Sequence, residues 1–194
     1  MAGEPHNLYN GIFPEGVFTG ARALTVQTYT EGNVKLGKQF ESSTYAAAIA
    51  PAANLDAIFI TGNVPVLITE RRIQFDGTLV TMRFYKDPVY SGGSPLATYN
   101  LSLISQSPST AQILYGAIVS STGIESSAPQ YNIGSEQSGK ATSSSALSIG
   151  NERSLPANSK FLIRLTNAGT IATSASYYMS WFEGEPDLPR AGDF

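Results

Sequence analysis

The stretch "SYYMSWFE", residues 176 to 183, decides the fold class because its side chains alternate with the period of a β-strand. Successive side chains of a strand point to opposite faces. The two resulting sets are Tyr177, Met179 and Trp181 on one face and Tyr178, Ser180 and Phe182 on the other. Since both faces carry aromatic groups, we expect this strand to be covered on both sides. One cover would be the domain core, and the other would be a second sheet, an arm or another subunit.

The preceding run "FLIRL", residues 161 to 165, alternates in the same way. Elsewhere the chain consists of short apolar runs separated by Gly, Pro, Ser and Thr, which is typical of all-β proteins. Counting these two, the pattern predicts about nine strands. The other seven are expected at residues 42–49, 55–61, 65–75, 79–86, 97–103, 111–120 and 141–149.

Two turns connect neighbouring strands of this series. Asp76-Gly77 separates "RRIQF" from "LVTMRFY" and offers the positive φ that a tight hairpin needs, so we expect residues 65–86 to form a hairpin. Asn167 and Gly169 predict a second hairpin over residues 161–183. Many short strands with such turns indicate an antiparallel β-sandwich or jelly roll.

The length of 194 residues suits one domain with arms. We expect an N-terminal arm at 1–20, a β-sandwich domain at 21–186 and an irregular tail at 187–194. The arm is rich in Gly and Pro and also carries large apolar residues, so it is predicted to dock either on its own domain or on a partner. These residues are Leu8, Tyr9, Ile12, Phe13 and Phe18.

Composition argues against several classes of partner. The net charge is −3 and only 14% of the residues are charged, which disfavours nucleic acid. The adjacent pair Arg71-Arg72 is interpreted as part of a solvated strand face. No stretch is apolar for long enough to cross a membrane, and no export signal is visible.

The stretch "GSEQSGKA", residues 134 to 141, resembles a phosphate-binding loop. Such a loop needs a launching strand, a Ser or Thr after the lysine and a following helix, whereas Ala141 occupies the hydroxyl position. We therefore interpret it as a polar loop, and no cofactor is expected. The single histidine, His6, is interpreted as solvated terminal sequence, and no cluster with metal-ligand spacing is present.

No catalytic constellation stands out. A serine nucleophile would lack a positioned base. Glu183 with Glu185, or with Asp187, could act as a carboxylate pair on a glycoside. The end of a strand followed by a solvated acidic tail explains these residues better.

Residues 61–105 and 155–186 carry two sequence motifs. The first stretch matches a "Y-x-x-P-x-Y-x-G-G" segment, and the second matches a closing "L-x-P-N-(S/T)-x-Y-L-(L/I)-R-(L/I)-T-N … W-(Y/F)-E" hairpin. The departures are Ala157 and Phe161, with Asn158 shifted by one position. The matching residues are Tyr85, Pro88, Tyr90, Gly92, Gly93, Leu155, Leu162, Arg164, Thr166, Asn167, Trp181 and Glu183. Through these motifs the chain resembles a family of tailed-bacteriophage virion proteins.

The resemblance implies a trimeric jelly roll made in the host cytoplasm and carried on the phage particle, namely a capsid decoration or cement protein without enzymatic activity. Its partners would be its own copies and the major capsid protein. Leu8, Tyr9, Ile12 and Phe13 would contact the capsid, and Tyr178, Trp181 and Phe182 would form the trimer contact. Two alternatives stay open: a receptor- or glycan-binding module of a head fibre or tail, and a small glycosidase using Glu183.

Overall fold

The structure is a computed structural model of the chain and describes residues 34, 36–77, 79–104, 107–133, 142–146 and 153–184. The expected arm at 1–20, the tail at 187–194 and the loop at 134–141 lie outside these residues. The same holds for His6 and for the four predicted capsid contacts, Leu8, Tyr9, Ile12 and Phe13.

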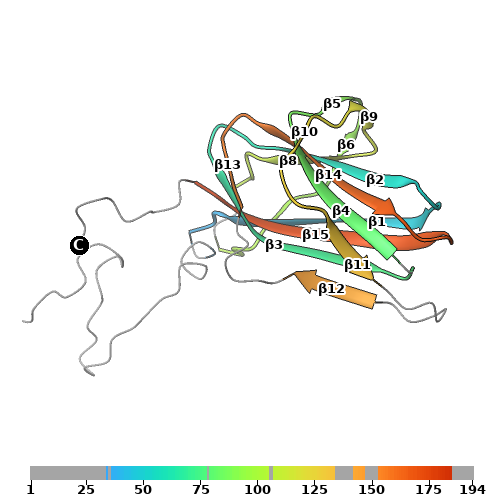
Figure 1. Cartoon of the computed structure of the whole chain (residues 1–194). Helices are drawn as coiled ribbons and strands as arrows, with labels where there is room; N and C mark the ends of the chain where they lie inside the picture. Colours follow the sequence, from blue (N-terminus) through green and yellow to red (C-terminus); the bar gives the residue numbers. More distant parts are fainter. Residues whose placement is uncertain are drawn as a thin grey trace, which may run out of the picture.

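Within the described residues, fifteen strands form three antiparallel sheets (Figure 1). The first sheet has the order β12 (Thr142–Ala146), β3 (Val66–Phe75), β15 (Thr173–Glu183), β1 (Gln39–Ile49) and β7 (Tyr99–Asn100), and β13 (Arg153–Leu155) also pairs with β3. The second sheet has the order β10 (Ile124–Glu125), β4 (Leu79–Lys86), β14 (Lys160–Asn167), β2 (Asn54–Ile60), β8 (Gln112–Tyr115) and β6 (Ser94–Pro95), and β11 (Gln130–Ile133) also pairs with β4. The short third sheet pairs β5 (Val89–Ser91) with β9 (Ile118–Ser121).

The first and second sheets enclose one hydrophobic core, so the described chain is an all-β, sandwich-like fold, as predicted. Trp181 lies fully buried in this core, with the ring of Phe40 stacked at 6.2 Å and the ring of Phe59 edge-on at 5.3 Å between centroids. Tyr177 and Met179 belong to the same cluster, which confirms the core face of residues 176–183. Each such large side chain contributes roughly 1.5–3 kcal/mol by leaving water.

The two predicted hairpins are wrong, because the strands on either side of each turn belong to different sheets. Strand β3 lies in the first sheet and β4 in the second, while β14 lies in the second and β15 in the first. The Asp76-Gly77 turn instead packs on the start of β15. The Asp76 carboxylate accepts a bond from the Ser174 amide at 2.6 Å, and a Cβ on Gly77 would lie 1.8 Å from Thr173 Oγ1. Gly77 is therefore required for close approach, and its φ is not positive.

The second face of strand β14 is covered by its own chain. Leu162 points away from the main core, yet it is fully buried, as is its cross-strand partner Ile58 on β2. Ile58 in turn lies opposite Leu114 on β8, and the glycine at 93 packs against Leu114. The third sheet stands above this end of the second sheet (Figure 1). Leu162 therefore needs no second subunit to leave water.

Candidate functional site on the outer face of the first sheet

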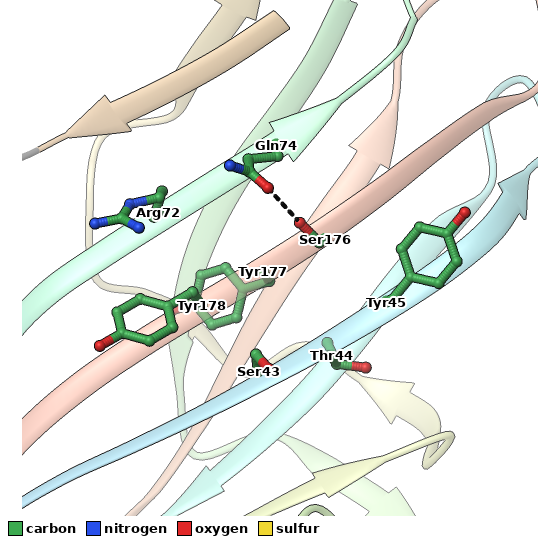
Figure 2. A pocket seen from close by; sticks show the side chains of 8 residues that line it. All are labelled: Ser43, Thr44, Tyr45, Arg72, Gln74, Ser176, Tyr177 and Tyr178. Carbon is green, nitrogen blue, oxygen red and sulfur yellow. Dashed lines mark hydrogen bonds between the residues drawn. The ribbon is translucent and has the colours of Figure 1, made fainter. Parts of the chain in front are cut away.

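The first sheet turns a polar and aromatic surface away from the core, which we call the tyrosine face. Its central rows consist of residues directly opposite one another on β1, β15 and β3, and such residues share a face of the sheet. The rows are Ser43, Tyr178 and Arg72, and next to them Tyr45, Ser176 and Gln74. A shallow hollow of about 420 Å³ lies over them (Figure 2).

Tyr178 is the most constrained member of the tyrosine face. Its hydroxyl donates to Glu41 at 2.7 Å, and the guanidinium of Arg72 lies 5.3 Å from its ring centroid. Burial raises the pKa of the Tyr178 hydroxyl, and the bond to Glu41 raises it further. Arg72 is also paired with Glu70. Tyr178 is therefore a neutral hydrogen-bond donor with a fixed orientation.

Two further tyrosines on this face are open to solvent. Tyr45 is 64% exposed, and Tyr99, which lies opposite Glu41 on the edge strand β7, is 63% exposed. In the row that contains Tyr45, Ser176 donates to Gln74 at 3.4 Å (Figure 2). An exposed aromatic ring beside hydrogen-bonding groups suits contact with a partner, since tyrosine offers an apolar body and a polar tip. The tyrosine face is suited to binding by stacking and hydrogen bonding.

The predicted trimer contact needs correction at two of its three residues. Trp181 is 0% exposed and Phe182 is 3% exposed within the single chain, so neither side chain is available to another subunit. Trp181 also lies on the opposite side of β15 from Tyr178, and the two could not share a surface. Tyr178 alone remains on an outer face.

Glu183 is buried rather than solvated, contrary to its interpretation as the start of an acidic tail. Its carboxylate accepts bonds from the Ser109 hydroxyl, from the Thr110 amide at 2.9 Å and hydroxyl at 2.8 Å, from the Ala111 amide at 3.1 Å, and from the Trp181 indole at 3.1 Å. Burial alone would raise the pKa of Glu183, but these bonds outweigh it and the pKa is lowered. The carboxylate is occupied on both oxygens and anchors the loop that precedes β8. Glu185 and Asp187, its proposed partners on a glycoside, lie outside the described residues.

The Arg71-Arg72 pair also departs from its interpretation as one solvated face. Arg72 reaches the tyrosine face, whereas Arg71 points inward and is 6% exposed. Strand alternation in β3 requires two adjacent residues to take opposite faces. The alternation pattern of the sequence therefore separates Arg71 from Arg72, whereas their charge does not.

The described part of the chain offers no candidate for a metal site or for a membrane-spanning helix. No group of three or more His, Asp or Glu side chains among these residues is arranged to hold a metal ion. No helix within the same residues is long and apolar enough to cross a membrane.

Comparisons with known proteins add little to this geometry. No family model matches the chain, and no curated protein matches it. Two solved structures, of the infectious bursal disease virus Gt strain and of the VP2 subviral particle of that virus, align at 11% identity over 95% and 91% of this chain, with TM-scores of 0.16 and 0.13. The chain spans about half the length of these two chains, 48% and 47%. TM-scores this low show no shared fold.

Proposed function

We propose that the chain is a structural protein of a tailed-bacteriophage virion, without enzymatic activity. In this proposal it is a capsid decoration or cement protein that binds and stabilises the outer surface of the head as a homotrimer. Residues 1–20 serve as an arm that grips the major capsid protein. The proposal begins from the sequence resemblance in residues 61–105 and 155–186.

The observation that carries the proposal is the strand order, which supports a jelly roll. Strands far apart in the chain lie side by side: β1 pairs with β15, β2 with β14, β3 with β12, and β4 with β11. These pairs are the ones expected of a long hairpin rolled into a sandwich, and the six- and seven-stranded sheets would add short edge strands to such a core. Jelly rolls of this kind are frequent in viral capsid domains. Such a strand order arises from the whole chain, so it is more specific than the all-β class.

The tyrosine face supplies a surface for the trimer. Tyr45 and Tyr99 are large and exposed, and the partly buried Tyr178 is held rigid between them and Arg72. Interfaces are enriched in tyrosine and arginine, because these side chains bury much area and still satisfy their polar atoms. Three copies meeting through this face would cover its exposed rings.

Binding to phage heads tests the proposal. The purified chain is mixed with heads that lack it, taken from the phage that encodes it, and sedimented. Saturable cosedimentation of the full chain is expected, whereas a variant lacking residues 2–20 should stay trimeric and remain in the supernatant. Failure of the full chain to bind heads would contradict the decoration role, and unchanged binding of the truncated chain would contradict the arm.

A receptor- or glycan-binding module of a head fibre or tail is the second candidate, favoured by the hollow on the tyrosine face. Tyr45 presents an exposed ring in the same hollow as the polar Gln74 and Arg72, and small-ligand sites combine aromatic walls with a few polar groups. Jelly rolls also occur in lectins. Binding on a glycan array that Tyr45→Ala abolishes, without affinity for heads, would favour this candidate over decoration.

A further inference from the structure

Arg71 is a positively charged residue that is buried at the side of the β-sandwich. It lies on β3 opposite Met179, with only 6% of its surface exposed. The ion pairs found among the described residues join Arg72 to Glu70, Arg83 to Glu125, Lys86 to Asp87 and Arg164 to Asp56. None of these involves Arg71, although a buried charge is costly unless another charge or several hydrogen bonds compensate it.

A second guanidinium lies on the same side of β3. Arg153 on β13 stands opposite Ile68, its guanidinium is 5.6 Å from the ring centroid of Phe84, and it donates to the Ser126 carbonyl at 3.2 Å. Burial lowers the pKa of Arg153, and the positive charge of Arg71 lowers it further. Both side chains lie on the core side of the first sheet, because the residues opposite them, Met179 and Ile68, belong to the core.

A cavity of about 280 Å³ opens at this edge, between β13 of the first sheet and β4 and β14 of the second. Arg153 and Lys86 line it, together with the hydroxyl-bearing Ser126 and Ser154. The acid nearest to Lys86 is Asp87 at 3.8 Å, and both of these side chains are about half exposed. Because one water occupies about 30 Å³, the cavity has room for a small anion. We call Arg71, Arg153 and Lys86 the basic edge.

We propose that the basic edge binds a small oxyanion, a phosphate or carboxylate group, with Arg153 and Lys86 as direct ligands and the buried Arg71 as a further positive charge that acts on Arg153. Guanidinium groups suit this ligand because their forked N–H donors match the oxygens of phosphate and carboxylate. The oxyanion supplies a negative charge to Arg71 and Arg153, neither of which is in an ion pair found among the described residues. This inference is independent of the virion role and is tested on the purified full chain.

The test is a calorimetric titration with inorganic phosphate and, separately, with acetate, in chloride buffer of constant ionic strength. Saturable binding with a Kd of roughly millimolar or tighter is expected for at least one of the two anions. Preference for phosphate would indicate a free or ester phosphate as ligand, and preference for acetate would indicate a carboxylate. Absence of saturable binding by both anions would overturn the proposal.

Two matched variants locate the site. Arg153→Gln removes one direct ligand from a partly exposed position and should lower the affinity for the preferred anion by about tenfold or more. Arg83→Gln removes an exposed guanidinium, paired with Glu125 on the second sheet, and should leave the affinity within about twofold of the parent chain. Unchanged affinity in Arg153→Gln, or equal weakening in both variants, would show that the anion binds elsewhere.

Discussion

At the scale of single residues, replacing Glu183 is expected to lower the free energy of unfolding more than replacing another side chain of its size. Glu183→Gln keeps the shape but places an amide N–H₂ among the donors of Thr110, Ala111 and Trp181. We expect a loss of about 2–4 kcal/mol in the free energy of unfolding, because bonds to a charged acceptor are strong and the buried donors lose their partner. Urea unfolding measures this. Glu125→Gln, at an exposed ion pair, is the control and should change stability by less than about 1 kcal/mol.

Glu183 also predicts how stability depends on pH. Its pKa is lower in the folded chain than the ordinary value of 4.5, so the folded state holds fewer protons on it than the unfolded state. The resulting stabilisation is complete above the unfolded pKa and is lost as the pH falls through the folded pKa. Urea midpoints measured from pH 6 down to pH 3 should fall more steeply for the parent chain than for Glu183→Gln. Parallel curves would contradict this role.

Replacing Arg71, in contrast, is expected to leave the stability of the fold unchanged or to raise it. Replacing a buried charge with an apolar side chain of similar volume is often neutral or stabilising by about 1–4 kcal/mol. Arg71→Met in phosphate-free chloride buffer should therefore unfold at the same urea concentration as the parent chain or at a higher one. A marked loss of stability would show that the charge is well compensated inside the fold.

These residues show what sequence can and cannot give at this scale. Alternation placed Tyr177, Met179 and Trp181 on one face, and they do lie together in the core. Composition then suggested that charged residues are solvated, which is wrong for Arg71 and Glu183. Burial of a charge depends on hydrogen-bond donors or charges that arrive from distant parts of the chain, and no local pattern reports them.

At the scale of elements, the long strands were predictable and their partners were not. Residues 79–86 were predicted as a strand and form β4 with the same bounds, and β1, β2 and β3 begin or end within a few residues of their predicted positions. The predicted strand at 111–120 is divided into β8 and β9, because Gly116 takes φ 71° between them. Both hairpins were wrong because turn residues report a chain reversal and do not specify which sheet receives the next strand.

The turn pattern of the sequence singles out Asn167 as a residue of a hairpin turn. In the structure Asn167 instead joins separate strands. Its side-chain amide nitrogen donates to the Ile49 carbonyl at 2.8 Å and to the Ile171 carbonyl at 2.7 Å. Its side-chain oxygen accepts a bond from the Gly169 amide at 3.0 Å. These bonds fasten the end of β1 to the connection between β14 and β15.

Asn167→Ala should therefore lower the free energy of unfolding by about 2–4 kcal/mol, since it leaves the buried Ile49 carbonyl and the partly buried Ile171 carbonyl without a donor. Hydrogen exchange should report the largest loss of protection near residues 49–53 and 167–173. Asn54→Ala, which removes one exposed bond to Thr166, is the control and should cost under about 1 kcal/mol. A cost for Asn167→Ala as small as that of the control would contradict the joint.

At the scale of the whole molecule, the proposed trimer is expected to be held together through the tyrosine face. The double variant Tyr45→Ala and Tyr99→Ala removes two exposed rings that the single chain does not need for its core. It should convert the trimer to monomers at micromolar concentration while leaving the circular dichroism spectrum unchanged. A variant that stays trimeric would place the contact on another face.

The mass of the full chain, measured by light scattering after size exclusion, tests whether the protein is a homotrimeric virion component. A homotrimer predicts a single species with about three times the chain mass of 20.6 kDa, retained on dilution. A stable monomer of about 20.6 kDa would contradict it and would leave the tyrosine face free for the glycan-binding alternative.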